Sequence, residues 1–217
     1  VLIGSGAAAA VTWVNYLGIR TAAIAQTIVT GLIICAGLLL FSGAAFDGQL
    51  ANAQPWIATP ASGVLAVLIM VPAMLVGFDV IPQSAEEIDL PPQQLGKLLV
   101  VSVFCAVAWY LLITLSVGLG LTAQQRADSS MATADAASAL WSNVSGGNWA
   151  GTFLVLGGIG GILTSWNAFI VGASRVLFAL AESGHVPAVF MRLHPKYKTP
   201  YVGILVIGIL SMLAPLF

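Results

Sequence analysis

An isolated carboxylate among helix-breaking residues is the feature of this sequence that most directly indicates a binding site. Asp79 follows a long uncharged stretch, and Pro72, Gly77 and Pro82 lie on either side of it. Proline removes a helix hydrogen-bond donor and glycine weakens a helix, so we predict a helix that stops near residues 76–78 and restarts with Asp79 as its N-cap. The free backbone N–H and C=O groups at such a break can bind the charged groups of a ligand.

Two adjacent hydroxyls lie in another uncharged stretch. Thr164 and Ser165 follow a Gly-rich segment in which Gly157 and Gly161 have the spacing that allows close helix packing. Hydroxyls in such a position bond back to their own helix, or ligate a hard cation such as Na⁺ through oxygen. The sequence leaves both interpretations open.

The elements that carry these residues are predicted from the distribution of charge. Charged residues make up 7% of the 217 residues and hydrophobic residues 59%, whereas an ordinary soluble domain has roughly 25% charged residues. A spanning helix needs about 20 predominantly apolar residues, and six uncharged stretches can each hold one. The apolar runs do not alternate with polar residues as the strands of a β-barrel do. We therefore predict an all-α polytopic membrane protein.

Six membrane spans are expected in total. They cover about residues 1–17, 21–42, 60–87 with a break near 76–78, 98–121, 149–181 and 201–217. A continuous, proline-kinked third span with Asp79 at the inner membrane interface is the alternative to the break. Segments 43–59 and 122–148 are expected to be connectors.

Basic residues predict the orientation. Alternation of the spans places six of the seven Lys and Arg residues on one side, and the positive-inside rule assigns that side to the cytoplasm. The loops 18–20, 88–97 and 182–200 are then cytoplasmic, and we expect an integral protein of the plasma (inner) membrane. The first and last spans begin and end abruptly, which suggests an interior piece of a longer protein.

Several other functions are excluded. The net charge is −1 and no basic patch is present, so nucleic acid is not an expected partner. Cys35 and Cys105 lie within spans and are interpreted as small packing residues. His185 and His194 lie in the basic loop, without a nucleophile at a suitable spacing, and are interpreted as solvated loop histidines. The chain is not expected to be an enzyme.

Two segments resemble the amino acid–polyamine–organocation (APC) permease family. Residues 77–79 (GFD) followed by 85–91 (AEEIDLP) are similar to the family's G-F-[DE] and A-E-E-x-x-x-P. Residues 174–187 (SRVLFALAESGHVP) and 194–200 (HPKYKTP) are similar to S-R-x-L-F-A-M-A-R-D-G-x-L-P and H-x-K-x-x-T-P. Residues 15–20 (NYLGIR) also resemble the family's N-x-x-G-[VI]-[RK].

The resemblance implies a fold and an activity. The fold is a five-plus-five inverted repeat in which helices 1 and 6 are discontinuous, and the six spans would be helices 4–9, so residues 1–217 would form a partial transporter domain. The activity is secondary active transport of an amino acid or related small amine across the lipid bilayer by alternating access. No cofactor is implied other than Na⁺ or H⁺ as the coupling ion.

The resemblance also implies a substrate site at the break. The backbone of Val76, Gly77 and Phe78 would receive the substrate's amino group, and Asp79 would couple protons or stabilise the break. Ala73 stands where the family often has a gating aromatic residue.

The rest of the implied site lies in the fifth span. Phe169 would line the substrate pocket there, and Thr164 and Ser165 match the hydroxyl ligands of sodium-coupled relatives. Ile33 replaces a lysine whose ammonium takes the place of sodium in several members, which disfavours a lysine-based proton mechanism.

Two alternatives to amino acid transport remain. One is a sodium-coupled symporter of another small organic solute. The other, from a different class, is a channel or a receptor-like membrane protein on the same fold.

Overall fold

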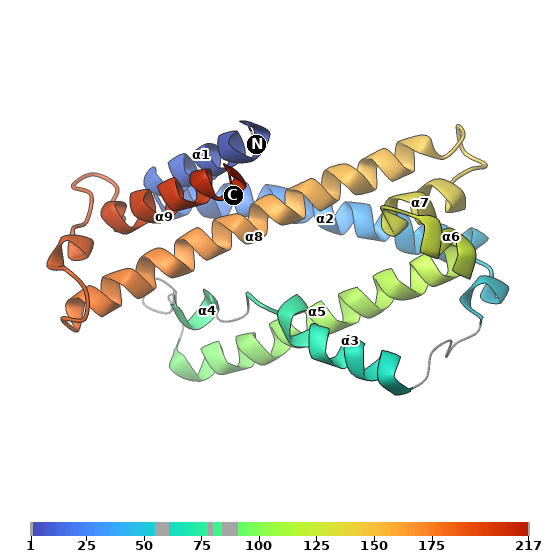
Figure 1. Cartoon of the computed structure of the whole chain (residues 1–217), viewed down its shortest axis with the longest axis horizontal. Coiled ribbons are helices and arrows are strands. Elements are labelled where there is room, and N and C mark those ends of the chain that lie inside the picture. The colour runs from blue at the N-terminus through green and yellow to red at the C-terminus, as the bar shows by residue number, and fades with distance from the viewer. Residues whose placement is uncertain (1, 55–60, 78–79, 84–90, 217) are drawn as a thin grey trace. The chain divides into compact units, whose positions relative to one another are not determined.

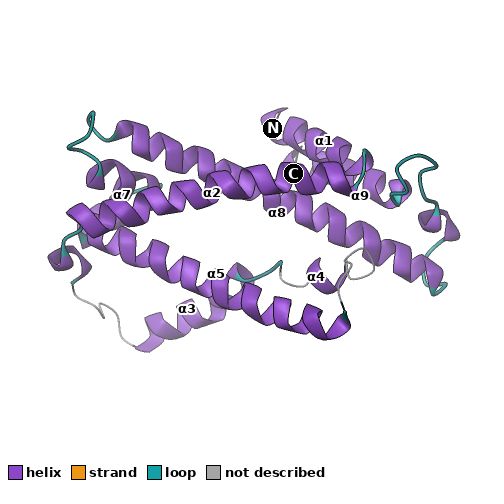
Figure 2. Cartoon of the chain, turned by 180° about the vertical axis from the view of Figure 1, so that it is seen from behind, coloured by secondary structure: helices purple, strands orange, loops and turns teal. Residues whose placement is uncertain are grey.

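The computed structural model describes residues 2–54, 61–77, 80–83 and 91–216, and all regular structure in these ranges is helical (Figures 1 and 2). The α-helices are α1 (Leu2–Tyr16), α2 (Ile19–Asp47), α3 (Ala61–Met74), α4 (Val80–Gln83), α5 (Pro92–Gly120), α6 (Ala123–Asp128), α7 (Ala132–Leu140), α8 (Asn148–Glu182) and α9 (Tyr201–Leu213). Short 3₁₀-helices cover Leu50–Ala53, Ala188–Met191 and Ala214–Leu216.

Three of these helices are long and apolar enough to cross a bilayer. They cover Arg20–Asp47, Gln93–Gly120 and Asn148–Glu182, and two shorter apolar helices cover Ser62–Met74 and Tyr201–Leu216. Their sequences favour continuous helices because a helix satisfies every backbone polar group within its own segment, as a lipid environment requires. The described residues thus have the all-helical, apolar character of a polytopic membrane protein.

A single glycine terminates α8. Gly184 has φ +78°, its N–H donates to Ala181 O at 3.0 Å, and the N–H of His185 donates to Leu180 O at 2.9 Å. These two bonds form a Schellman motif, in which a glycine in the left-handed region closes the helix. The glycine of the S-R-x-L-F-type segment therefore ends the longest helix.

The chain folds into two compact units. Unit 1 contains Val1–Thr30, Gly77–Lys97 and Gly161–Phe217, and unit 2 contains Gly31–Val76 and Leu98–Gly160. The helices α2, α5 and α8 each contribute residues to both units.

In unit 1, α1 and α9 lie side by side and antiparallel (Figure 1). The Ser5 hydroxyl near the start of α1 donates to Met212 O near the end of α9 at 2.9 Å. Gly208 meets the side chain of Thr12 so closely that a Cβ atom would not fit. Small residues let two membrane helices approach in this way.

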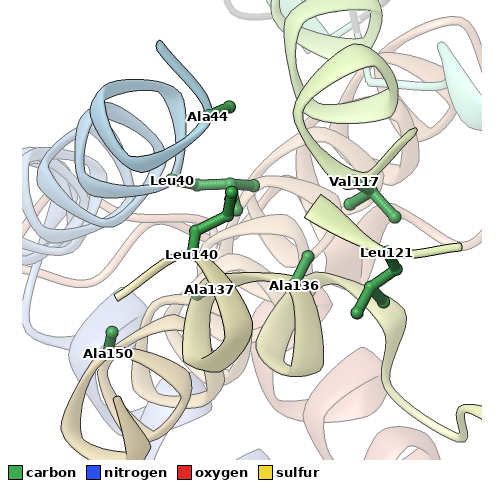
Figure 3. Packing of buried hydrophobic residues seen from close by; sticks show 8 residues of the cluster. All are labelled: Leu40, Ala44, Val117, Leu121, Ala136, Ala137, Leu140 and Ala150. Carbon is green, nitrogen blue, oxygen red and sulfur yellow. The ribbon is translucent and has the colours of Figure 1, made fainter. Parts of the chain in front are cut away.

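In unit 2, buried side chains from four helices form one core. Figure 3 shows Leu40 and Ala44 of α2, Val117 of α5, Leu121 just after α5, Ala136, Ala137 and Leu140 of α7, and Ala150 of α8. Gly157 of α8 approaches α2 so closely that an added Cβ would lie 2.8 Å from Ala36 Cβ, which agrees with a packing role for this glycine.

Two predicted connectors are partly helical. Segment 122–148 lies between α5 and α8 and contains α6 and α7, and α7 contributes buried residues to the core of unit 2. Its Ala-rich sequence favours helix, and its apolar positions cover α2 and α5. Residues 92–97, expected in a loop, are the first turns of α5.

The two cysteines are free thiols on apolar helices. Cys35 and Cys105 are exposed among the described residues, on helices long enough to cross a bilayer, and their interpretation as small packing residues stays a prediction.

Candidate functional site

The interruption of the third predicted span is visible in the described residues. α3 ends at Met74, residues 75–77 form a turn, and α4 begins at Val80. Gly77 has φ +120°, a conformation that a side chain would strain, and its carbonyl accepts the Val80 N–H at 3.2 Å. Phe78 and Asp79 lie outside the described residues, so the predicted N-cap and acidic residue stay predictions.

Ala73 and Val76 belong to unit 2, where both side chains are exposed. The Tyr110 hydroxyl donates to Met74 O at 3.0 Å and so satisfies one of the carbonyls left by the end of α3. The role of Ala73 and Val76 in binding substrate stays a prediction.

The remaining predicted site residues lie on α8 in unit 1 and face different directions. Thr164 is buried, and its hydroxyl donates to Gly161 O at 2.9 Å, whereas Ser165 is exposed. Successive helix residues are about 100° apart, so Ser165 shares a face with Phe169 one turn later, and Thr164 does not. Phe169 is 46% exposed.

Thr164 lies instead beside a chain of amides that joins three helices. Asn15 Nδ2 of α1 donates to Asn167 Oδ1 of α8 at 2.7 Å, and Asn167 Nδ2 donates to Gln26 Oε1 of α2 at 3.0 Å. Asn15 also donates to Val11 O at 2.9 Å and is buried. Thr164, Asn167 and Gln26 line an otherwise apolar cavity of about 250 Å³. Sequence reasoning missed this network because it searched for charges, and amides inside apolar stretches were the available signal.

The opposite side of α8 receives α4. An added Cβ at Gly172 would overlap Gln83 Oε1 and lie 3.4 Å from Val80 Cγ2, so the Gln83 side chain packs directly on the backbone of α8 at this glycine. Gln83 was not predicted as a site residue.

Gln83 separates two cavities on this side of α8. One cavity, of about 500 Å³, is lined by Gln83, Phe169, Ala173, Val176, Leu177 and Ile207. We call it the Phe169 cavity. The other, of about 360 Å³, contains charged residues and is also lined by Gln83 and Val176. The structure thus places Phe169 in a cavity of its own unit.

His194 is not the solvated loop histidine that the sequence suggested. Its Nδ1 accepts the N–H groups of Lys196 and Tyr197, each at 3.2 Å. Its ring stacks on Tyr197 with centroids 4.7 Å apart and meets the edge of Tyr16 at 5.1 Å. The cluster fastens the loop before α9 to the end of α1, and Thr199 adds a hydrogen bond to Tyr16 O.

Metal-ligating groups are sparse in the described ranges. No group of three or more His, Cys, Asp or Glu there could hold a metal ion. Thr164 donates its proton to a carbonyl, which leaves the lone pairs of its oxygen available to a hard cation. The sodium interpretation of Thr164 and Ser165 therefore stays a prediction.

Comparison with known proteins identifies the family. A family described as "Amino acid permease" matches residues 1–217. The chain belongs to the amino acid permease family. This confirms the resemblance to the APC superfamily and makes the chain part of an integral membrane protein.

Several curated transporters are similar to this permease chain. The branched-chain amino acid permease BcaP of Bacillus subtilis is 30% identical over 94% of the chain and 43% of its own length. Cationic amino acid transporter 4 of Mus musculus is 32% identical over 71% of the chain and 24% of its own length. A vacuolar cationic amino acid transporter 4 of Arabidopsis thaliana is 26% identical over 93% of the chain. The chain spans less than half the length of these relatives.

Proposed function

We propose that the full-length protein is a secondary active transporter that moves an amino acid or related small amine by alternating access. Family membership supports transport of amino acids. The similar proteins are named for branched-chain and for cationic amino acids, whose side chains differ in charge. These amino acids share an α-amino group beside a carboxylate, and a small amine shares the ammonium group with them.

The helix interruption between Met74 and Val80 is the observation that carries this proposal. Two helix ends in one apolar segment leave backbone carbonyls at the first end and N–H groups at the second. Carbonyl oxygens suit an ammonium group and N–H groups suit a carboxylate. The positive φ of Gly77 favours a turn that interrupts the helix over a continuous helix with a proline kink.

Uptake by the reconstituted full-length protein tests the proposal. Proteoliposomes would be given labelled L-leucine, L-arginine and putrescine, and we expect saturable uptake of at least one of them. Absence of uptake of all three by well-folded protein would contradict it.

Phe169 offers a matched pair of variants for the same assay. Phe169→Ala should raise the KM of uptake about tenfold, because a substrate loses an apolar contact of about 1.4 kcal/mol. Leu156→Ala is the control, since Leu156 is on the same helix and similarly exposed (51% against 46%). Equal effects of the two variants would count against a pocket role for Phe169.

Sodium coupling is the second candidate within transport. Thr164 keeps its oxygen lone pairs available, and Ile33 occupies the position that the resemblance assigns to a charged lysine in other members. Replacement of external Na⁺ by choline at a constant pH gradient should then abolish uptake. Thr164→Val should raise the Na⁺ concentration needed for half-maximal uptake. Unchanged uptake of the wild type in choline would exclude sodium coupling, and H⁺ coupling or exchange would then be the remaining modes.

The orientation remains part of the proposal. Loops 18–20 and 182–200 and the segment 88–97 are assigned to the cytoplasm of a plasma membrane by their basic residues. Among the similar proteins one is named as vacuolar, so the choice of membrane rests on the sequence alone.

A further inference from the structure

The cavity next to the Phe169 cavity contains charges of both signs. It has a volume of about 360 Å³ and is lined by α4, the last turns of α8 and the loop before α9. Among the described residues, the charged ones that line it are Arg175, Glu182 and Lys198, and Gln83 adds an amide. Ligand pockets have volumes of roughly 300–1,000 Å³, so a small solute fits. We call it the charged cavity.

We propose that the charged cavity is a second, weaker binding site for the transported amino acid. A free amino acid is a zwitterion, with an ammonium group and a carboxylate on one carbon. Glu182 would take the ammonium group and Lys198 would take the carboxylate, with the positive charge of Arg175 in the same cavity. This inference rests on the proposed function, since it takes its ligand class from there.

Two of the charged residues occupy positions that their local structure disfavours. Glu182 is the last residue of α8, where the helix dipole opposes a negative charge. Lys198 has φ +56°, a left-handed conformation that costs a lysine free energy and that glycine or asparagine would adopt more easily. Residues kept in unfavourable positions are found most often at functional sites.

Two of the three charged side chains have no ionic partner in the part of the chain that the structure describes. Among the residues that the structure describes, no ion pair joins Glu182 or Lys198 to another side chain. Arg175 is held in place by a hydrogen bond from Nη1 to Val171 O at 2.7 Å. A zwitterion would therefore meet an oriented guanidinium and two side chains without ionic partners in these ranges.

The loop that presents Lys198 is fixed before any ligand arrives. The Lys198 N–H donates to His194 O at 2.9 Å, and the His194 N–H donates to Thr199 O at 2.8 Å. Thr199 and Pro200 are buried. Preorganisation of this kind lowers the entropy cost of binding.

The charged cavity adjoins the Phe169 cavity through two shared residues. Gln83 and Val176 line both cavities. In this proposal, a solute that leaves the Phe169 cavity past Gln83 and Val176 would meet the charged cavity next. The weaker site would thus hold the amino acid between the Phe169 cavity and the end of the unit that carries the basic loop.

Equilibrium binding to the full-length protein in nanodiscs tests this site. The probe is labelled L-leucine or L-arginine, whichever the wild type transports, and we expect two binding phases. Glu182→Gln and Lys198→Asn should each weaken the second phase roughly three- to tenfold and leave the first within twofold. Asparagine tolerates the left-handed backbone, so Lys198→Asn should fold as the wild type does.

Two further variants make the outcomes unambiguous. Phe169→Ala should weaken the tight phase and spare the second, and Lys196→Asn should change neither phase, because Lys196 lies in the same loop but does not line the cavity. Single-phase binding by a wild type that transports, or a second phase intact in both Glu182→Gln and Lys198→Asn, would overturn this site alone. Absence of both binding and uptake would overturn the proposed function as well.

Discussion

The side-chain oxygen of Gln83 occupies the space that a Cβ atom at position 172 would need. Gln83 belongs to α4, which follows the helix interruption, and Gly172 belongs to α8 between Phe169 and Arg175. The pair therefore places an amide from the interrupted span at the boundary of the two cavities.

Gly172→Ala should displace the Gln83 side chain rather than unfold the protein, because the overlapping atom is the end of a flexible chain. We expect the KM of uptake to change in the same direction as in Gln83→Ala, and the double variant to show no further change. Gly158→Ala is the control, since an added Cβ there meets nothing within 4 Å. Additive effects of Gly172→Ala and Gln83→Ala would show that the two residues act separately.

Asn167→Leu should lower the free energy of unfolding in detergent by about 1–2 kcal/mol, because it removes the hydrogen bonds to both Asn15 and Gln26. Asn167→Asp keeps the acceptor for Asn15 and loses the donor to Gln26. In double-mutant cycles, the aspartate of Asn167→Asp should therefore still show a coupling energy with Asn15→Ala, but none with Gln26→Ala. Thr27→Val is the control, as its exposed hydroxyl bonds only its own helix. Equal stabilities of the wild type and Asn167→Leu would show that the amide chain contributes nothing.

Arg126→Gln should destabilise unit 2. The Arg126 guanidinium donates to Asn52 O at 3.1 Å and Gly118 O at 3.2 Å, and also to Leu121 O, so it caps the end of α5 and ties it to the preceding 3₁₀-helix. We expect a loss of about 1–3 kcal/mol, measured by thermal unfolding. Arg192→Gln, at an exposed loop position, should leave the melting temperature within about one degree.

His194→Phe should loosen the loop before α9. It keeps an aromatic ring against Tyr197 and removes the acceptor for the N–H groups of Lys196 and Tyr197. We expect trypsin to cut faster after Lys196 and Lys198, and His194→Asn to restore part of the protection. His185→Phe is the control, because its ring nitrogen contacts only the exposed Ser183 hydroxyl. An unchanged cleavage rate in His194→Phe would show that other contacts hold the loop.

Long uncharged stretches were sufficient to predict an all-helical membrane protein, because helix length and hydrophobicity are local properties of the sequence. The motifs around Gly77 and Gly184 were sufficient to predict the family. The helix preceding Gly77 ends at Met74, two residues before the segment where the break was expected. Helix ends depend on capping and turn geometry, which a pattern of residues locates only approximately.

What the sequence did not predict depends on contacts between distant residues. Asn15 and Asn167 are 152 positions apart, and neither carries a charge that would mark it in an apolar span. His194 was interpreted as solvated because it lies in the basic loop rather than in a span, whereas Tyr16 packs against it from α1. Segment 122–148 was predicted to be a connector because it is polar and rich in small residues, and that pattern did not predict that α7 contributes to a buried core.

Counterflow in proteoliposomes tests the central claim most directly. Vesicles containing the full-length protein are loaded with unlabelled L-leucine or L-arginine and diluted into a trace of the same labelled amino acid, with no ion gradient. A carrier that exposes one site alternately to each side must accumulate label transiently above the external concentration. We expect this transient accumulation of label. Label that only equilibrates across the membrane, without an overshoot, would contradict alternating access and indicate a channel.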